Sequence, residues 1–262
     1  MDRTRLFLNL GPAIAEVRLF GLPSDILGPS VERSTTNRCD LRVDIHAAGG
    51  SPDGPPEGAV GLNTPFFSGF WDAASTSACV TLTAMDAELC APARQCHGVL
   101  RLLLSTWIRE RGGIVLHGAA LIHRGGAHIF LGASGAGKTT LARRFPEGHR
   151  LGDDYIALLP DGEGRFRVHG TSLRGRERLA GSLGSHPLDS IAILEQSSDP
   201  SREILGASSA LPQVLRHAFA HHQCTEERSD HLATALAIVQ VVPVSRLGMT
   251  RTSDPFIQAV RP

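Results

Sequence analysis

The most informative segment of this chain reads Ala127-His128-Ile129-Phe130-Leu131, then Gly132-Ala133-Ser134-Gly135-Ala136-Gly137-Lys138-Thr139, then Thr140-Leu141-Ala142-Arg143-Arg144-Phe145. The first part is a short apolar run, which predicts a buried strand. The last part is a good helix former that stops at Pro146. A strand, a glycine-rich loop and a helix in this order predict an α/β fold whose loop N–H groups face a bound anion.

The loop matches the pattern G-x-x-x-x-G-K-[ST], a Walker A or P-loop motif that cradles the phosphates of a nucleoside triphosphate. Lys138 is expected at the β- and γ-phosphates, and the Thr139 hydroxyl is expected on Mg²⁺. The predicted nucleotide-binding residues are Gly132, Ala133, Ser134, Gly135, Ala136, Gly137, Lys138, Thr139 and Thr140.

Lys138 is the only lysine in the chain. The other 25 of its 26 lysine and arginine residues are arginine. A strong bias toward arginine preserves lysine only where the two residues are not interchangeable. A compact ammonium fits between phosphates where a planar guanidinium is too wide. The lone lysine therefore supports the phosphate-binding interpretation.

Composition narrows the class of protein. A hydrophobic content of 42 % is ample for a core, and the formal net charge of +0 argues against a nucleic-acid or anionic-membrane partner. The five cysteines are odd in number and lack C-x-x-C spacing, so neither a disulfide framework nor a zinc site is predicted. With no long apolar run and no signal-peptide pattern, we expect a cytoplasmic protein.

The first part of the chain predicts a small β-rich accessory domain over residues 1–96. Its apolar and polar residues alternate, which is typical of half-buried strands, around a Gly/Pro/Ser-rich loop over 47–61. The strands are expected at 5–10, 15–20, 41–45 and 80–83. Trp71, among phenylalanines, is expected in the core or a lid of this domain.

Residues 97–262 predict an α/β domain with a mixed sheet. Its expected helices cover 99–111, 140–145, 208–224, 226–238 and a short segment from Asp254-Pro255. Its expected strands cover 114–122 and 127–131 as a pair, a hairpin of 150–159 with 166–170, and then 190–194 and 241–247.

A carboxylate pair, Asp153 and Asp154, follows Lys138 by only fifteen residues. One carboxylate of such a pair suits Mg²⁺, and the other suits the proton of an acceptor hydroxyl. The alternative interpretation from residue type alone is an Asp-rich surface turn.

The order His117-Gly118-Ala119-Ala120, the glycine loop, and His149-Arg150-Leu151-Gly152-Asp153-Asp154 resembles the HPr kinase/phosphorylase family. The longer ATP-dependent phosphoenolpyruvate carboxykinases share the loop and the Gly-Asp-Asp. The resemblance is specific over residues 114–159 and says little about residues 1–96. It implies an HPr-kinase/PEP-carboxykinase-like P-loop domain that uses ATP and Mg²⁺.

Carried over residue by residue, the resemblance implies catalytic roles for Lys138, for Asp153 as general base and for His117 near the reaction centre. Asp154 and Thr139 would organise the metal, and the roles of Asp153 and Asp154 could be exchanged. For His117 the alternative is a core histidine whose ring bonds to the backbone. Members of the family often form oligomers, so a homo-oligomer is compatible with the resemblance.

Two other basic clusters admit alternatives. The Glu-x-Arg-Gly segment of the HPr-phosphorylating enzymes is not cleanly present, and three arginines in residues 174–178 stand in the comparable region. They suit either a phosphoryl clamp or a solvated loop. In the cluster of His217, His221 and His222, the first two have the i, i+4 spacing of a helical zinc-binding pair. The segment lacks the Glu of an H-E-x-x-H motif and has no further ligand nearby to complete a site. We therefore favour a polar helix face over a zinc site.

The predicted function is a kinase that transfers the γ-phosphate of ATP to a hydroxyl of a peptide, protein or small molecule. Because related small kinases act on ribosomally made peptides, a serine of a natural-product precursor is the leading acceptor. The alternative is a nucleotide-dependent binding or regulatory module without net transfer. Carboxykinase-like lyase chemistry is disfavoured by the length of the chain.

Overall fold

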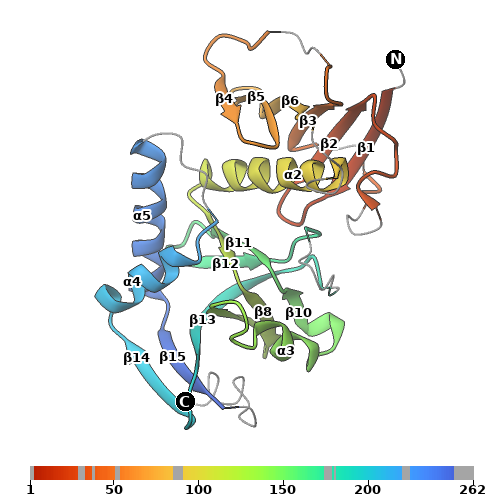
Figure 1. The fold of residues 1–262 in the computed structure, drawn as a ribbon. Helices are drawn as coiled ribbons and strands as arrows, with labels where there is room; N and C mark the ends of the chain where they lie inside the picture. Colours follow the sequence, from red (N-terminus) through yellow and green to blue (C-terminus); the bar gives the residue numbers. More distant parts are fainter. Residues whose placement is uncertain are drawn as a thin grey trace. The chain divides into compact units, whose positions relative to one another are not determined.

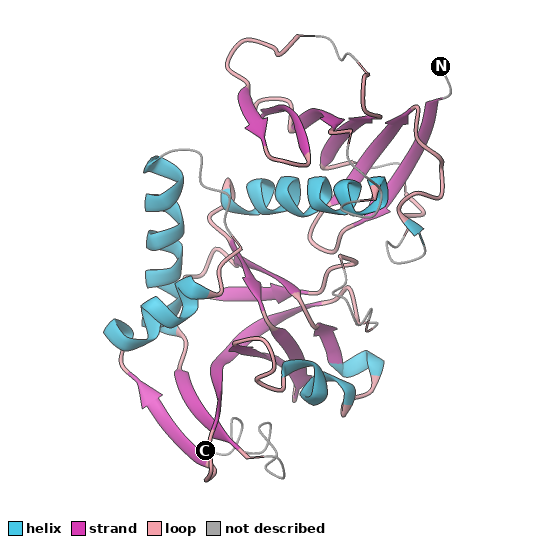
Figure 2. Ribbon diagram, viewed as in Figure 1, coloured by secondary structure: helices cyan, strands magenta, loops and turns pink. Residues whose placement is uncertain are grey.

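The structure is a computed structural model that describes residues 3–28, 33–36, 39–50, 54–84, 91–173, 179, 181–219 and 225–250. The chain is mixed α/β and divides into two compact units, residues 1–107 and residues 108–262, each with its own mixed sheet (Figures 1 and 2). Within the described residues, no helix has the length and apolarity needed to cross a bilayer.

The first unit contains a six-stranded sheet in the order β1-β2-β3-β6-β5-β4. The bounds are β1 (Arg3–Asn9), β2 (Ile14–Phe20), β3 (Leu41–His46), β4 (Val60–Asn63), β5 (Phe67–Asp72) and β6 (Ser77–Leu82). The pairs β2–β3 and β3–β6 are parallel and the others are antiparallel. The four strands expected from alternation are confirmed as β1, β2, β3 and β6, whereas β4 and β5 were not predicted.

Strand β5 contains the aromatic cluster of the first unit. Trp71 and Phe67 are buried, as expected for core residues, while Phe66 just before the strand is 43 % exposed. Gly69 is required between them because a Cβ there would lie 2.1 Å from the Cys79 carbonyl oxygen of β6. A glycine inside a strand lowers the strand signal of a sequence, which explains why β5 was missed.

Helix α2 (Pro92–Arg109) confirms the helix expected at 99–111 and begins earlier. The turn after Arg109 contains Gly112, whose φ of +71° is easily adopted only by glycine. The N–H of Gly113 donates to the Ile108 carbonyl at 2.9 Å, which closes the last turn. The division of the chain places α2 through Trp107 in the first unit, whereas the sequence pattern assigned residues from 97 onward to the second.

The second unit is built on a nine-stranded sheet with the path β10-β8-β9-β13-β12-β11-β7, and with β15 and β14 continuing from β13. The strands are β7 (Ile114–His117), β8 (Ala119–His123), β9 (Gly126–Gly132), β10 (Arg150–Gly152), β11 (Tyr155–Pro160), β12 (Phe166–His169), β13 (Ser185–Gln196), β14 (Ser201–Leu205) and β15 (Val244–Met249). The helices are α3 (Lys138–Arg143), α4 (Ala207–Arg216) and α5 (Thr225–Val241), with a 3₁₀ turn, η2 (Glu147–His149).

Strands β9, β13 and β15 run parallel, so their carboxyl ends meet at one edge of the sheet. Ligands of α/β proteins bind at such an edge. The glycine loop leaves from the end of β9, and Gln196 and Met249 mark the ends of the other two strands. The sheet therefore brings three chain segments to the loop.

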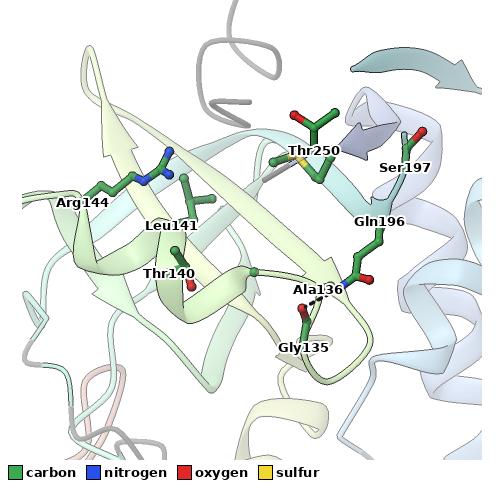
Figure 3. Close-up of a pocket in the computed structure, with 10 residues that line it drawn as sticks. Gly135, Ala136, Thr140, Leu141, Arg144, Gln196, Ser197 and Thr250 are labelled. Atoms are coloured by element: carbon green, nitrogen blue, oxygen red, sulfur yellow. Dashed lines mark hydrogen bonds between the residues drawn. The ribbon is translucent and has the colours of Figure 1, made fainter. Parts of the chain in front are cut away.

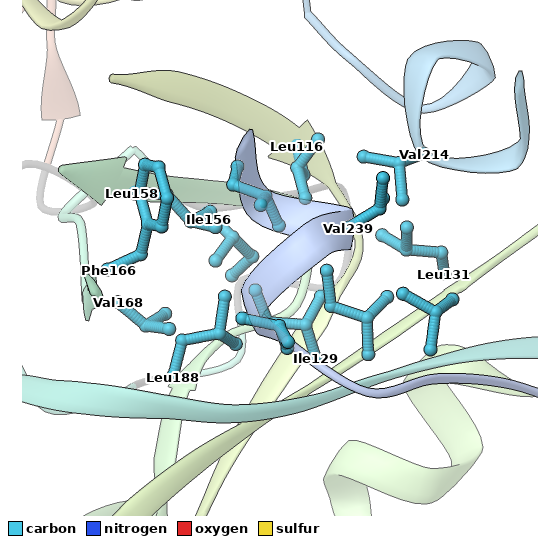
Figure 4. Close-up of a cluster of buried hydrophobic side chains, with 14 of the residues drawn as sticks. Leu116, Ile129, Leu131, Ile156, Leu158, Phe166, Val168, Leu188, Val214 and Val239 are labelled. Atoms are coloured by element: carbon cyan, nitrogen blue, oxygen red, sulfur yellow. The ribbon is translucent and has the colours of Figure 1, made fainter. Parts of the chain in front are cut away.

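Two apolar layers bury β9 on both faces. Ile129 and Leu131 belong to a large cluster that includes residues of β7, β11, β12, α4 and α5 (Figure 4). Phe130 belongs to a second cluster with Leu141 of α3 and Leu247 of β15. A strand buried on both faces reads as a continuous apolar run, which is why 127–131 was recognised from the sequence.

The predicted single strand over 114–122 is wrong, because the chain bends at Gly118. A Cβ at Gly118 would lie 2.9 Å from the Phe130 carbonyl oxygen, so the two backbones approach closely there. Beyond the bend, β8 forms the expected hairpin with β9 across Arg124 and Gly125, both of positive φ. Before it, β7 pairs with β11 instead.

The expected hairpin over 150–159 and 166–170 is confirmed for β11 and β12, while β10 separates from it and pairs with β8. The expected strand over 190–194 lies within β13, and β14 was not predicted. Helix α5 covers the expected 226–238 and runs on to Val241, so the last expected strand starts at Val244 as β15. The helix expected at Asp254-Pro255 lies outside the described residues.

The helix predicted over 208–224 is too long, because α4 ends at Arg216. The chain then leaves the helix and runs beside β7. The Phe219 N–H donates to the Val115 carbonyl at 2.7 Å, and the His117 N–H donates to the His217 carbonyl at 2.7 Å. This short pairing brings the end of α4 to the end of β7.

Candidate functional site

The glycine loop makes a tight turn between β9 and α3. Gly135 and Gly137 have φ of +83° and +101°, in the region that only glycine adopts without strain. The Ala136 N–H donates to the Ala133 carbonyl at 3.1 Å, and the side-chain amide of Gln196 donates to the Gly135 carbonyl at 3.2 Å. The loop is thus held both by its own backbone and by the end of β13.

Lys138 is the first residue of α3 and is 7 % exposed. Its Nζ donates to the carbonyl oxygens of Gly132 (2.6 Å) and Ala133 (3.0 Å). Burial lowers the pKa of Lys138, and the charge of nearby Asp154 opposes that effect. The ammonium therefore lies against the first residues of the loop, within electrostatic reach of Asp154.

Asp154 lies beside His117, and the histidine Nδ1 is 2.6 Å from the Asp154 Oδ1. The side chain of His117 is 52 % exposed, so it is not the buried histidine of the alternative interpretation. Asp153 is 8 % exposed, and the Asp154 side chain is 17 % exposed. The two carboxylates are therefore not a solvated surface turn. His117 comes from the end of β7, and the pair follows β10.

His217 joins this group, although the sequence assigned it to a polar helix face. Burial, followed by the positive charges of Lys138, His117 and Arg216, lowers the pKa of His217 to about 4. The ring is therefore neutral at pH 7. No sequence pattern pointed to this placement, since it depends on α4 ending at Arg216. His221, His222 and residues 174–178 lie outside the described part of the chain.

A family comparison supplies the identity of the chain. Residues 85–256, more than half of the sequence, match the family described as SynChlorMet cassette protein ScmC. The chain belongs to the ScmC family. The matched region contains the glycine loop, His117, Asp153 and Asp154. No curated protein matches the chain.

Among solved structures, the ScmC-family chain is similar to the structure of the Hpr(Ser) kinase/phosphatase from Coxiella burnetii. The sequences are 11 % identical, the match covers 55 % of this chain and 90 % of that chain, and the TM-score is 0.32.

Two pockets border the glycine loop of this ScmC-family chain. The first, of about 440 Å³, is shown in Figure 3. It is lined by Gly135, Ala136, Gly137, Thr140, Leu141, Arg144, Gln196, Ser197, Met249 and Thr250. The second, of about 390 Å³, is lined by Gly132, Ala133, Ser134, Ala136, Ile193, Leu194, Glu195, Gln196, Gln213, Arg216 and His217. The loop therefore has space on both sides for parts of a ligand.

Thr139 and Asp154 supply oxygen atoms of the kind that Mg²⁺ prefers. The described residues contain no group of three or more His, Cys, Asp or Glu side chains arranged to hold a metal ion. The two oxygen donors of Thr139 and Asp154 suit a Mg²⁺ ion whose other ligands are phosphate oxygens and water. This is the usual way in which Mg²⁺ is bound with nucleotides.

Proposed function

We propose that this ScmC-family chain is an ATP- and Mg²⁺-dependent kinase that transfers the γ-phosphate to a hydroxyl of a peptide. The observation that carries the proposal is the grouping of Lys138 in a glycine loop with Asp154 and His117. A lysine ammonium buried against such a loop suits the charge of phosphates, and a neighbouring carboxylate pair suits metal and proton. The resemblance of the same residues to the HPr kinase family supports it.

In this proposal the acceptor hydroxyl oxygen forms a bond to the γ-phosphorus while the bond from that phosphorus to the β,γ-bridging oxygen breaks. The electron pair of the broken bond leaves with ADP. Asp153 takes the hydroxyl proton, and Lys138 stabilises charge on the phosphoryl oxygens. Bound Mg²⁺, held by Thr139 and Asp154, would supply further neutralisation of the phosphate charge.

His117 holds the carboxylate of Asp154, and metal-ligating carboxylates are commonly oriented by such a neighbouring residue. We therefore assign Asp154 to the metal and Asp153 to the proton. The Nδ1–Oδ1 contact of 2.6 Å also fixes the rotamer of Asp154. His117 is then a positioning residue for the proposed metal ligand.

The peptide acceptor is proposed from the family. The family description names a cassette protein, and a protein of a cassette is expected to act on a substrate, here a peptide, that the same cassette supplies. A serine hydroxyl fits the chemistry proposed for Asp153, because any alcohol acceptor must lose its proton as the new oxygen–phosphorus bond forms.

The proposal is tested with ATP labelled on its γ-phosphate and candidate precursor peptides. Asp153→Asn should keep nucleotide affinity within about threefold and lose about a hundredfold or more of the transfer rate. Asp25→Asn, at an exposed aspartate of the first unit, is the matched control and should behave as wild type. Release of label only to water would favour the regulatory module, and full transfer by Asp153→Asn would refute the base assignment.

A further inference from the structure

The two pockets beside the glycine loop differ in what their walls offer. This inference rests on the proposed function, because it concerns how ATP would lie across the loop. The walls share Ala136 and Gln196. Beyond these, the first pocket is bounded by the start of α3 and the end of β15, and the second by the first loop residues and the end of α4.

Lys138 indicates which pocket receives the terminal phosphates. Its Nζ donates to the carbonyls of Gly132 and Ala133, and both residues line the second pocket. His217, which lines the same pocket, lies within electrostatic reach of Lys138. The β- and γ-phosphates therefore belong on this side of the loop, which leaves the first pocket, with Leu141 and Met249, for the nucleoside.

Arg216 supplies a cationic side chain to the second pocket. Among the described residues, no ion pair joins it to a carboxylate. It is the exposed last residue of α4. Glu195, the acidic residue of that wall, is 3.2 Å from the Nε of Arg246, so part of its charge is already matched. The neighbouring His217 ring is neutral at pH 7 because its pKa is lowered to about 4. The pocket thus offers a guanidinium to an anion.

We infer that Arg216 binds the γ-phosphate of ATP and is a further catalytic residue of the proposed phosphoryl transfer. A guanidinium donates two parallel hydrogen bonds to phosphate oxygens and stabilises the charge that they carry during transfer. Arg216 lines the same pocket as Gly132 and Ala133, the residues that hold Lys138, so a phosphoryl group in this pocket would have a cation from each. The rival role is recognition of an anionic group on the acceptor, which would leave nucleotide binding untouched.

The test compares two nucleotides, because only one of them has a γ-phosphate. Calorimetric affinities for the β,γ-imido analogue of ATP and for ADP, each with Mg²⁺, are measured with the full chain. Arg216→Gln should weaken the ATP analogue about tenfold or more and change ADP less than about twofold. Arg216→Lys keeps the charge but loses the paired hydrogen bonds, and should fall between wild type and Arg216→Gln.

Arg228→Gln is the matched control, since Arg228 is also an exposed helical arginine and lines neither pocket. It should leave both affinities unchanged. Retained ADP binding by Arg216→Gln shows that the variant is folded. If wild type binds both nucleotides and Arg216→Gln binds the ATP analogue equally well, the assignment of Arg216 is overturned. If wild type binds neither nucleotide, the proposed function itself fails.

Discussion

At the scale of single residues, the position of Lys138 is the one that we expect to tolerate substitution least. Its Nζ lies 2.6 Å and 3.0 Å from two carbonyl oxygens of the loop, inside a site where it is 7 % exposed. A guanidinium is wider and planar, so Lys138→Arg should displace the loop even though the charge is kept. We expect turnover to fall about a hundredfold or more while the fold remains. Circular dichroism and a γ-phosphate transfer assay measure the two effects, and an active Lys138→Arg protein would contradict the argument.

At the same scale, His169 of β12 predicts how the stability of the protein depends on pH. Burial, and then the charge of Arg167, lowers its pKa to about 4 from the ordinary 6.5. Between these values the unfolded chain binds a proton that the native chain does not, so stability is lost as pH falls from about 6.5 toward 4. His169→Gln should lose less stability between pH 7.5 and pH 5 in urea denaturation. His217 contributes in the same direction, so part of the loss should remain. Equal losses in both proteins would show that His169 is not held neutral.

At the scale of elements, one side chain ties the glycine loop to β13. The exposed Gln196 donates its amide hydrogen to the Gly135 carbonyl at 3.2 Å. Gln196→Leu removes this bond and should let the loop fluctuate, so ATP-analogue affinity should fall about threefold to tenfold. The free energy of unfolding should change by less than about 1 kcal/mol because the residue is exposed. Gln240→Leu on α5 is the matched control, and equal affinities for the two variants would disprove the tether.

The elements also show which parts of the structure a sequence reveals. Strand β9 was predicted because Phe130 and its neighbours Ile129 and Leu131 are buried on opposite faces, which makes all three apolar. Strand β14 was missed because it is largely exposed, with Ile204 61 % accessible, and lacks a clear period. Lys138 and the aspartate pair could be predicted as site residues because their motif is local. His217 and Arg216 could not, because their place beside the loop follows from where α4 ends and how the next residues pair with β7.

At the scale of the whole molecule, the second unit holds a complete core of its own. Among the described residues, its two apolar clusters draw only on residues between Ile114 and Met249. The glycine loop, His117 and the carboxylate pair lie in the same unit, residues 108–262. A core formed by the described side chains of the second unit itself should suffice for cooperative folding, because burial of apolar surface is the main stabilising term.

We therefore expect a fragment of residues 108–262 to unfold in one cooperative transition and to bind the ATP analogue within about threefold of the full chain. The fragment keeps the Arg109–Asp230 ion pair and, just before β7, the turn at Gly112. Residues 1–107 should bind no nucleotide, and transfer to a peptide by the fragment measures what the first unit adds to acceptor binding. The fragment lacks Trp107, so its unfolding cannot be followed by the fluorescence of that residue. Circular dichroism is the suitable probe. A fragment that remains unfolded would show that the second core depends on the first unit.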